Sequence, residues 1–536
     1  MPEFLDGWAL TAMTFAPLVG VLIMAVIPKE AEDTHKLVAL LTSLGVAVLA
    51  VLVAFEFDYD AAETLQLAED HKWIDVINAR YLLGIDGIAL PLILLTAGVV
   101  PLVFIYSWDH IPAPGNAKMF LMLQLILEVG MMGSFVAQDL ILFFVFFEVV
   151  LLPMYFMIGV WGGPDRQYAS IKFFLYTLFG SALMLVSFLA LYFTTGAETF
   201  SMVGLAEQVR ARDIALGTQV LIFGGMFLGF GVKVPMFPFH TWLPDAHTQA
   251  PTQGSVILAA VLLKLGTYGF VRIALPILPQ AAVKWAPIIG VLAVIGIIYG
   301  ALGCLAQTDM KRLIAFSSVA HMGYVMLGIS TLTDYGINAA IFGMVAHGLI
   351  TGMLFFIAGS VKERYHTLEI KRLGGLLVQA PHMGWILGFC TMASLGLPGL
   401  AGFWGEFPAI LSAYQPAPGL NVTLYRTFMV IAAVGTVLAA GYLLWLLQRT
   451  AFGTPSEEFA DDPEIVDLRT PEVLAWSPLL VLIVVLGFVP NLLFNLTDPA
   501  VSAQADAACM SVAAGDDSIS EDECFDDEVE TASEGE

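Results

Sequence analysis

Long apolar runs, each bounded by charged residues, proline or glycine, alternate along the chain with short polar connections. A membrane span needs about 20 apolar residues, so runs of this length predict transmembrane helices. We expect fourteen of them, an even number that places both termini on one side of the membrane. The predicted helices lie near residues 8–28, 36–56, 82–107, 118–137, 139–160, 168–195, 216–237, 253–275, 285–307, 312–330, 335–360, 381–412, 424–450 and 472–494.

The composition excludes a soluble fold. Apolar residues make up 58% of the 536 residues and charged residues only 13%, whereas a soluble domain is about a quarter charged. The predicted fold class is therefore an all-α polytopic membrane protein. The amino-terminal apolar run lacks the basic region of a cleaved signal peptide, so we expect it to remain as the first helix.

Basic residues are distributed unevenly between the two sets of loops. The odd-numbered loops and their flanks hold thirteen of the 22 Lys and Arg residues and the even-numbered loops hold seven, while Lys233 and Lys264 lie inside helices. Short cytoplasmic loops retain Lys and Arg. The distribution predicts that the odd loops face the cytoplasm and that both termini lie on the opposite, periplasmic side.

The formal net charge of −25 is concentrated at the carboxyl end, where residues 501–536 hold twelve Asp or Glu and no Lys or Arg. Such a segment has too little apolar surface to fold, so we expect an acidic, disordered tail over residues 497–536. A cation-attracting antenna is the alternative function of this tail. The four cysteines have no CxxC spacing, which indicates neither a disulfide framework nor a metal site.

Seven of the predicted helices carry an ionisable residue within their apolar run. A charge at the bilayer centre costs at least ~2.5 kcal/mol, so it persists only when it faces other helices, water or a partner. One acid–base pair could simply hold two helices together, but a series of groups that gain and lose protons indicates a relay. The candidate residues are Glu128, Glu148, Lys233, Lys264, His321, His347 and Glu406.

Some candidates have simpler explanations. A lone histidine can donate to a backbone carbonyl, although imidazole titrates near neutral pH and can pass a proton between its two nitrogens. Glu128 could pair with a residue of a neighbouring helix. The connection between helices 7 and 8 is rich in polar or special residues, which either cap helices or admit protons. These residues are His240, Trp242, Pro244, Asp245, His247 and Gln249.

Two predicted helices are interrupted, and they lie five helices apart. Prolines follow Lys233 at the end of helix 7, and Pro398 with several glycines precedes Glu406 in helix 12. Interrupted helices at matching places predict two inverted repeats whose exposed backbone lines an ion path. We expect amino-terminal helices over residues 1–117, repeats over 118–275 (helices 4–8) and 285–450 (helices 9–13), and a last helix over 472–494.

In this alignment of the repeats, Glu148 corresponds to His321, and Lys233 corresponds to Glu406. Two half-channels that open to opposite sides would then meet at the middle of the membrane. Lys264, His321 and His347 are the residues expected at the junction.

Motifs between about residues 80 and 450 resemble those of a known family. They are Tyr81-Leu-Leu-Gly-Ile-Asp-Gly87, Phe146-Phe-Glu148-Val-Val-Leu-Leu-Pro153, Lys233-Val-Pro-Met-Phe-Pro-Phe-His240, Leu263-Lys264-Leu-Gly266, Gln307-Thr-Asp-Met-Lys-Arg-Leu-Ile-Ala-Phe-Ser-Ser-Val-Ala-His321 and Gly402-Phe-Trp-Gly-Glu406. The family is that of the antiporter-like, proton-pumping subunits of NADH-quinone oxidoreductase, respiratory complex I. The fit is best to subunit M (chain 4), because Glu rather than Lys stands in the interrupted helix 12.

The resemblance implies proton translocation across a bacterial inner membrane, beside homologous antiporter-like subunits. It implies that Glu148 pairs with Lys233, that Lys264 leads into a central polar axis, and that Glu406 ends the relay. NAD, FMN, iron–sulfur clusters and quinone would belong to partner subunits. The chain itself has no Walker loop, dinucleotide fingerprint or cysteine ligand set, so we expect no cofactor, metal or nucleic acid on it. The alternatives are a subunit of a multi-chain sodium/proton antiporter and a passive scaffold.

Overall fold

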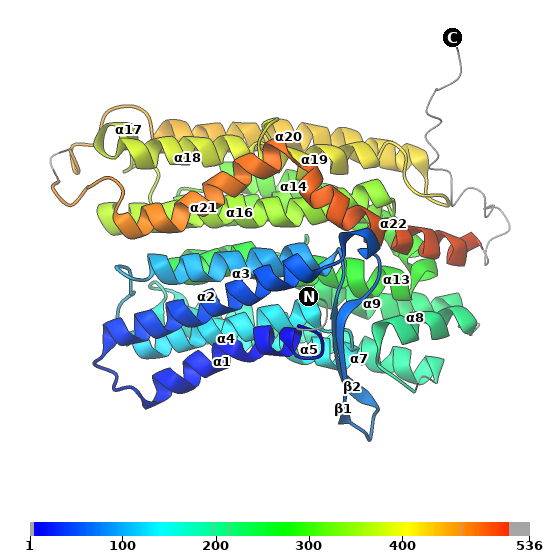
Figure 1. Ribbon diagram of the computed structural model, residues 1–536. Coiled ribbons are helices and arrows are strands. Elements are labelled where there is room, and N and C mark those ends of the chain that lie inside the picture. Colours follow the sequence, from blue (N-terminus) through cyan, green and yellow to red (C-terminus); the bar gives the residue numbers. More distant parts are fainter. Residues whose placement is uncertain (1–4, 197, 213, 461, 514–536) are drawn as a thin grey trace, which may run out of the picture.

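The structure is a computed structural model that describes residues 5–196, 198–212, 214–460 and 462–513 (Figure 1). Within these residues, 13 helices are long and apolar enough to cross a membrane, and the consecutive helices α18 and α19 form one further, interrupted crossing. The prediction of an all-α membrane protein with about fourteen crossings is therefore confirmed.

The continuous crossings are α1 (Ala9–Val26), α2 (Glu32–Glu56), α3 (Ala89–Tyr106), α4 (Ala117–Val136), α5 with α6 (Leu140–Val149 and Leu151–Trp161), α7 (Arg166–Thr195), α9 (Leu216–Lys233), the segment from α11 to α13 (Thr252–Ile277), α14 (Pro279–Leu305), α15 (Met310–Ser330), α16 (Asp334–Tyr365), α20 (Val422–Thr450) and α21 (Thr470–Phe488). The shorter helices are α8 (Met202–Ala211), α10 (Trp242–Gln249), α17 (Leu376–Gln379), α18 (Pro381–Ser394), α19 (Ala401–Ser412) and α22 (Asn491–Ala513).

Three crossings form the centre of the bundle. In the most apolar stretch of each crossing, 100% of the residues are buried in the Thr252–Ile277 segment and in α16, and 94% in α15. In α2 the share is 28%. α15 packs between α14 and α16, and α16 also contacts α11 and α19. The helices that carry Lys264, His321 and His347 are therefore shielded from lipid by the rest of the chain.

The helices run roughly side by side across Figure 1, so their connections gather at two ends of the molecule. The α1–α2 connection and α17 lie at one end, on the left of the view. The β-hairpin, α8 and α22 lie toward the other end. Odd-numbered and even-numbered connections therefore occupy opposite ends.

A two-stranded antiparallel hairpin, β1 (Gln66–Ile74) with β2 (Ala79–Ile85), precedes α3. The sequence prediction missed it and began the third helix at residue 82, inside β2, so that boundary is wrong. Strand β2 is apolar at its end, and an apolar run cannot be assigned to a strand or a helix by periodicity alone.

The hairpin caps the start of α1 and donates to the residue that caps α5. The Glu69 carboxylate accepts hydrogen bonds from the backbone N–H groups of Leu10 (2.8 Å) and Thr11 (3.1 Å) in the first turn of α1. Asp139 caps α5 and accepts a further bond from the backbone N–H of Arg80 in β2 (3.0 Å). The first four N–H groups of a helix lack partners within the helix, so these carboxylates fix the hairpin against the crossings.

The carboxyl-terminal segment is helical where the sequence predicted disorder. Helix α22 extends to Ala513, so the prediction of a disordered tail from residue 497 is wrong as far as that residue; residues 514–536 lie outside the described part. Asn338 of α16 donates to Asp498 (2.7 Å) and accepts from Thr497 (2.7 Å), which docks α22 on the bundle. Cys509 is disulfide-bonded, which the cysteine spacing did not indicate.

Candidate functional site

Lys264 lies in the middle of the bundle, between two π-helical turns at Leu258–Leu262 and Phe270–Ala274. Such turns interrupt the α-helical hydrogen-bond pattern and occur often at functional sites. The fully buried Nζ atom donates to the backbone oxygen of Ala259 (2.5 Å) and lies 2.7 Å from Nδ1 of His347 on α16. The local change of helix type therefore supplies a carbonyl partner for a charge that has no access to water.

His321 on α15 is held between two polar side chains from the interrupted crossing. Its Nδ1 atom lies 2.5 Å from Oε1 of Glu406 on α19, and its Nε2 atom lies 3.1 Å from Oγ of Ser394 at the end of α18. Gly396 in the break has a φ of +75°, which favours glycine. The turn through this residue brings both partners to one imidazole ring.

A close contact between helices also depends on glycine. A Cβ atom on Gly405 of α19 would lie 2.4 Å from the Cα atom of Gly343 on α16. Any side chain at residue 405 would therefore push α19 away from α16. This contact keeps Glu406 within reach of the central helices.

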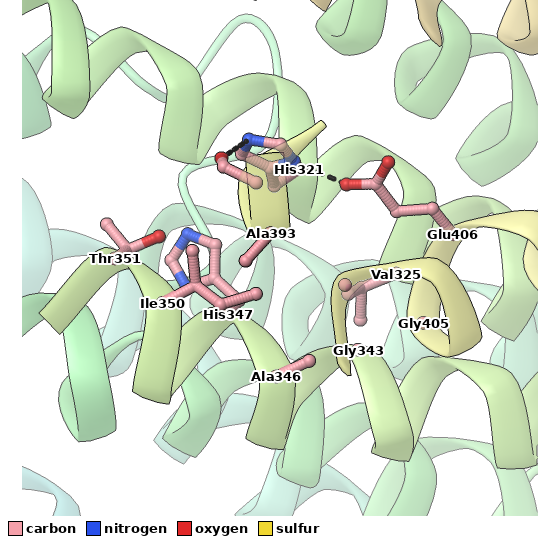
Figure 2. Close-up of a pocket in the computed structure, with 12 residues that line it drawn as sticks. His321, Val325, Gly343, Ala346, His347, Ile350, Thr351, Ala393, Gly405 and Glu406 are labelled. Atoms are coloured by element: carbon pink, nitrogen blue, oxygen red, sulfur yellow. Dashed lines mark hydrogen bonds and ion pairs between the residues drawn. The ribbon is translucent and has the colours of Figure 1, made fainter. Parts of the chain in front are cut away.

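The two histidines face a common cavity. Their ring centroids are 6.0 Å apart, and Thr351, Ser394 and Glu406 complete the polar part of the cavity wall. Figure 2 shows Glu406 on one side of His321 and His347 with Thr351 on the other. The volume open to the centres of water molecules is about 20 Å³, which is enough for one water.

The hydrogen-bond partners constrain where protons reside. If Lys264 is an ammonium group, it donates to Nδ1 of His347, and that nitrogen must then carry a lone pair. The N–H of the neutral ring is then on Nε2, a buried atom without a hydrogen-bond partner among the described residues. His347 can therefore accept a proton on one side and release another on the opposite side.

The predicted pair of the first half, Glu148 and Lys233, does not form a contact. In the part of the chain that the structure describes, Nζ of Lys233 has no hydrogen-bond partner and lies 4.6 Å from the ring centroid of Phe147. Ser181 lies beside the Glu148 carboxyl group, whose Oε1 atom has no hydrogen-bond partner among the described residues. Glu148 and Lys233 are therefore not an ion pair in this conformation.

Comparison with known proteins identifies the family. Residues 137–438 match the family described as "NADH:quinone oxidoreductase/Mrp antiporter, TM", and residues 14–134 match "NADH-ubiquinone oxidoreductase chain 4, amino terminus". The chain is 41% identical over 504 residues to NADH-quinone oxidoreductase subunit M of Rhodobacter capsulatus, covering 92% of this chain and 95% of that protein. The chain belongs to the NADH:quinone oxidoreductase/Mrp antiporter family.

Further relatives agree with this membership. NAD(P)H-quinone oxidoreductase chain 4-1 of Synechocystis is 36% identical over 505 residues, covering 94% of each chain. A chain of respiratory complex I from Thermus thermophilus has the same fold, with a TM-score of 0.82, 27% identity, and coverage of 93% of this chain and 99% of that one. A chain of the Mrp complex from Dietzia, at 23% identity, a TM-score of 0.79 and coverage of 93% and 52%, shares the fold.

In this member of the NADH:quinone oxidoreductase/Mrp antiporter family, Glu128 is isolated from the other candidates. It is fully buried in α4, and neither carboxylate oxygen has a hydrogen-bond partner among the described residues. A buried carboxylate without a partner is strongly unfavourable, so the site accommodates the neutral acid. The expected alternative, a pair with a neighbouring helix, is not formed.

The polar connection after α9 separates into an outer and an inner part. Asp245 lies 2.7 Å from Nζ of Lys172 and 3.6 Å from a guanidinium nitrogen of Arg312, so it belongs to a partly exposed ion network. His247 is fully buried, stacks on Phe355 at 4.3 Å, and has no partner on either ring nitrogen within the described residues.

His240, the remaining histidine of this connection, stacks on aromatic rings. Its ring lies 5.7 Å from Phe237 and 4.9 Å from Tyr299, and its Nδ1 atom has no partner among the described residues. Of the three candidates in this connection, His247 is the one whose charge environment includes Lys264.

Three buried cations, Arg272, Lys311 and Arg364, were missed because they were counted with the loops. Arg272 is paired with Asp86, with its Nη1 atom 2.6 Å from Oδ2. Lys311 is buried in the first turn of α15 and donates to the backbone oxygen of Ala250 (2.5 Å). Arg364 makes two hydrogen bonds to the Glu472 carboxylate (2.8 and 2.7 Å), and both side chains are fully buried. Their position at helix ends gave no signal of burial. Within the described residues, no group of three or more His, Cys, Asp or Glu side chains is placed to hold a metal ion.

Proposed function

We propose that this chain is a membrane-arm subunit of an NADH-quinone oxidoreductase and that it translocates protons across the membrane. The relatives named subunit M, at 41% and 40% identity over most of the chain, support this proposal. NADH oxidation and quinone reduction then take place in partner subunits that hold NAD, FMN, iron–sulfur clusters and quinone. Homologous antiporter-like subunits are the neighbours expected in the membrane.

The observation that carries the proposal is the unbroken series of titratable groups in the most buried helices. Lys264 contacts His347 at 2.7 Å, the two histidines share a cavity, and His321 contacts Glu406 at 2.5 Å. A purely structural role would not need a series of ionisable groups, because neutral polar groups can hold helices together at a lower desolvation cost. A series of groups that can each bind one proton is suited to transfer.

A transfer step can be written atom by atom. The Lys264 ammonium group gives a proton to Nδ1 of His347, and His347 releases its Nε2 proton to water in the cavity. That water protonates Nε2 of His321, the nitrogen now bound to Ser394, and His321 passes its Nδ1 proton to the Glu406 carboxylate. Each histidine returns to a neutral ring, as proton transfer through imidazole requires.

The driving step is assigned to Glu148 and Lys233. Moving one proton against about 150 mV requires ~3.5 kcal/mol. Two unit charges at a separation of about 4 Å interact by ~4 kcal/mol at an effective dielectric constant of 20. The energy of forming or breaking the Glu148–Lys233 ion pair is therefore large enough to make a neighbouring lysine bind or release a proton.

The orientation and the repeats are part of the same proposal. We place both termini on the periplasmic side of a bacterial inner membrane, because basic residues gather in the odd loops. Residues 118–275 and 285–450 are the proposed inverted units. A sodium/proton antiporter subunit is less well supported, because the Mrp likeness at 23% identity shows the fold alone.

The test uses the assembled complex in sealed, inverted membrane vesicles from cells that carry Lys264→Ala. We expect NADH-driven proton uptake and NADH-quinone turnover to fall by roughly a hundredfold, the scale of losing one proton-transfer group. Lys118→Ala is a matched control, because Lys118 also donates to backbone oxygens, those of Ala25 and Ile27 (both 2.8 Å), but lies outside the relay. Sodium-free buffer distinguishes protons from sodium.

Normal uptake and turnover in a fully assembled Lys264→Ala complex would contradict the relay and favour a scaffold. Uptake that disappears without sodium in the unaltered complex would instead favour the antiporter. Assembly is measured on native gels, so a folding failure is recognised separately.

A further inference from the structure

A second pair of titratable residues lies outside the central series, at the end of the molecule where the odd loops gather. His110, just after α3, has its Nε2 atom 2.7 Å from Oε2 of Glu363 near the end of α16. This is an ion-pair distance, but the approach does not have the angle of a hydrogen bond, and Nε2 has no hydrogen bond among the described residues. Its Nδ1 atom lies 2.7 Å from the backbone oxygen of Tyr106. The His110 side chain is 1% exposed and that of Glu363 is 34% exposed, so the pair connects a buried ring to water.

The contacts of the ring show that the pair holds a proton. A backbone oxygen can only accept, so Nδ1 of His110 must donate to Tyr106. A neutral ring then has only a lone pair on Nε2, which would repel a carboxylate at 2.7 Å. The contact requires one more proton, either on the imidazole or on the Glu363 carboxyl group. This shared proton is the one that the pair can gain and lose.

Among the described residues, Glu363 has one ion-pair partner, His110. On α16, Arg364 is bound by Glu472 of α21, and that ion pair is fully buried and satisfied. α3 contributes Tyr106, whose ring stacks on His110 at 4.2 Å. α11 contributes Gln253, which cannot titrate. Burial lowers the pKa of His110 and the Glu363 carboxylate raises it, and the net pKa lies above its ordinary value of 6.5.

The inner side of the pair adjoins the helix that carries Lys264. Gln253, in the first turn of α11, donates to the backbone oxygen of His110 (2.6 Å). Lys264 lies roughly 16 Å further along the same crossing, at 1.5 Å per residue. Tyr106 and Ser360, whose hydroxyl oxygens are 3.4 Å apart, add polar atoms on the inner side of the pair.

We propose that His110 and Glu363 form a proton-uptake site at the cytoplasmic end of this chain and supply the central relay. The Glu363 carboxylate accepts a proton from a hydronium ion in bulk water, and Nε2 of His110 then accepts that proton from Oε2. The resulting imidazolium releases its Nδ1 proton on the inner side, where Nδ1 faces the Tyr106 carbonyl, and the ring returns to its neutral form. This inference rests on the proposed function and on the orientation given above. It deepens that function by naming where protons enter.

A purely structural role is separated from uptake by the pH profile. When uptake limits turnover, the rate falls on the alkaline side as the pair loses its proton. His110→Gln and Glu363→Gln keep polar side chains of similar size but remove the titrating group. We expect the pH at which turnover is halved to fall by about one unit or more in each variant. This shift is about a tenfold change in proton concentration, which lies within the effect of losing one acid–base group. Glu363→Asp retains a carboxylate, so most of the turnover at alkaline pH that Glu363→Gln loses should be present in this variant.

A matched control lies on the same side of the molecule. His366 and Glu464 also form a histidine–glutamate contact, at 3.2 Å, but their side chains are 72% and 69% exposed. His366→Gln should therefore leave the profile unchanged. All variants are measured as NADH-quinone turnover and proton uptake of the complete complex in sealed vesicles between pH 6 and pH 9, about the range in which histidine pairs titrate.

The inference is overturned if His110→Gln and Glu363→Gln complexes have the profile of the His366→Gln control. It is also overturned if their turnover falls equally at every pH, because that result indicates a structural contact. Lys264→Ala in the same vesicles separates the two proposals. If Lys264→Ala abolishes uptake while the pair variants behave as the control, only the entry site is wrong; if Lys264→Ala has no effect, the proposed function fails.

Discussion

The two halves of the bundle hold their acidic residues differently. In the second half, Glu406 lies 2.5 Å from His321, whose other nitrogen contacts Ser394. In the first half, Glu148 and Lys233 share no contact, and the ring of Phe147 lies 4.6 Å from the lysine Nζ atom. A proton held in a short contact is retained, whereas an unpaired group is free to change its state. We call the Glu406–His321 contact the closed site and the Glu148–Lys233 pair the open site. The structure therefore has one of each in the same conformation.

The position of each helix break explains the difference. α9 ends at Lys233, so the lysine stands at the end of its helix, before the turn that leads to α10. Glu406 lies in the second turn of α19, after the break, and is pressed toward α15 and α16 by the close contact at Gly405. The break before α19 thus holds Glu406 against His321, and the break after α9 leaves Lys233 without a polar partner among the described residues.

Of these two sites, the Glu148–Lys233 pair is expected to give the larger effect when it is removed. Lys233→Ala and Glu148→Gln should each reduce NADH-driven proton uptake and turnover by roughly tenfold or more, because a group that must switch its charge is lost. Glu32→Gln and Lys36→Ala are controls of the same chemical kind, since they change a glutamate and a lysine that pair with each other near the start of α2, outside the relay. Uptake at unaltered levels in assembled Lys233→Ala complex would show that the open site is not part of the relay.

A smaller effect is expected at the closed site. Ser394→Ala removes the hydroxyl group that contacts Nε2 of His321 at 3.1 Å. Turnover should fall about two- to tenfold, which corresponds to a hydrogen bond of roughly 0.5–1.5 kcal/mol. Ser412→Ala, in the same interrupted crossing but bonded only to the Ala409 backbone, should have no such effect. Equal losses in the two serine variants would indicate loosened packing of the crossing.

The smallest effect is expected at Glu128. Its carboxyl group is buried without a partner in the described structure, so the acid form is accommodated. Glu128→Gln has nearly the same shape and no charge, and turnover should stay within about twofold of the unaltered complex, the range in which a neutral hydrogen-bonding exchange falls. A tenfold loss in assembled complex would place Glu128 in the relay with the other acids.

The membrane crossings could be predicted because each is long and apolar, but the elements at the ends could not. Strand β2 was assigned to the third helix, since its apolar residues continue directly toward α3. Helix α22 was assigned to a disordered tail, since its sequence alone does not reveal the contacts of Thr497 and Asp498 with Asn338 on a distant helix. The second error concerns contacts between residues far apart in the chain, whereas the first concerns a local pairing that the apolar pattern did not distinguish from a helix.

The candidate residues of the site could be predicted from the sequence, but their contacts could not. A buried ionisable residue is conspicuous within an apolar run, which is why seven candidates could be named. Arg272, Lys311 and Arg364, which are buried nearer to helix ends, were not named. The partners of the seven candidates were not predictable, because the contact of Lys264 with His347 and the absence of one between Glu148 and Lys233 depend on helix packing. His110 and Glu363 were missed because each stands beside other polar residues at a helix end.

The two π-helical turns beside Lys264 determine how this helix would respond to the insertion or deletion of a residue. Each turn accommodates about one residue more than an α-helical turn, so it behaves as a single-residue insertion that the surrounding bundle tolerates. Deleting one residue from Leu258–Leu262 would return this stretch to α-helical pitch and rotate Lys264 relative to Gln253 and the rest of the first turn. The contact with His347 therefore depends on the number of residues in the helix as well as on their identity.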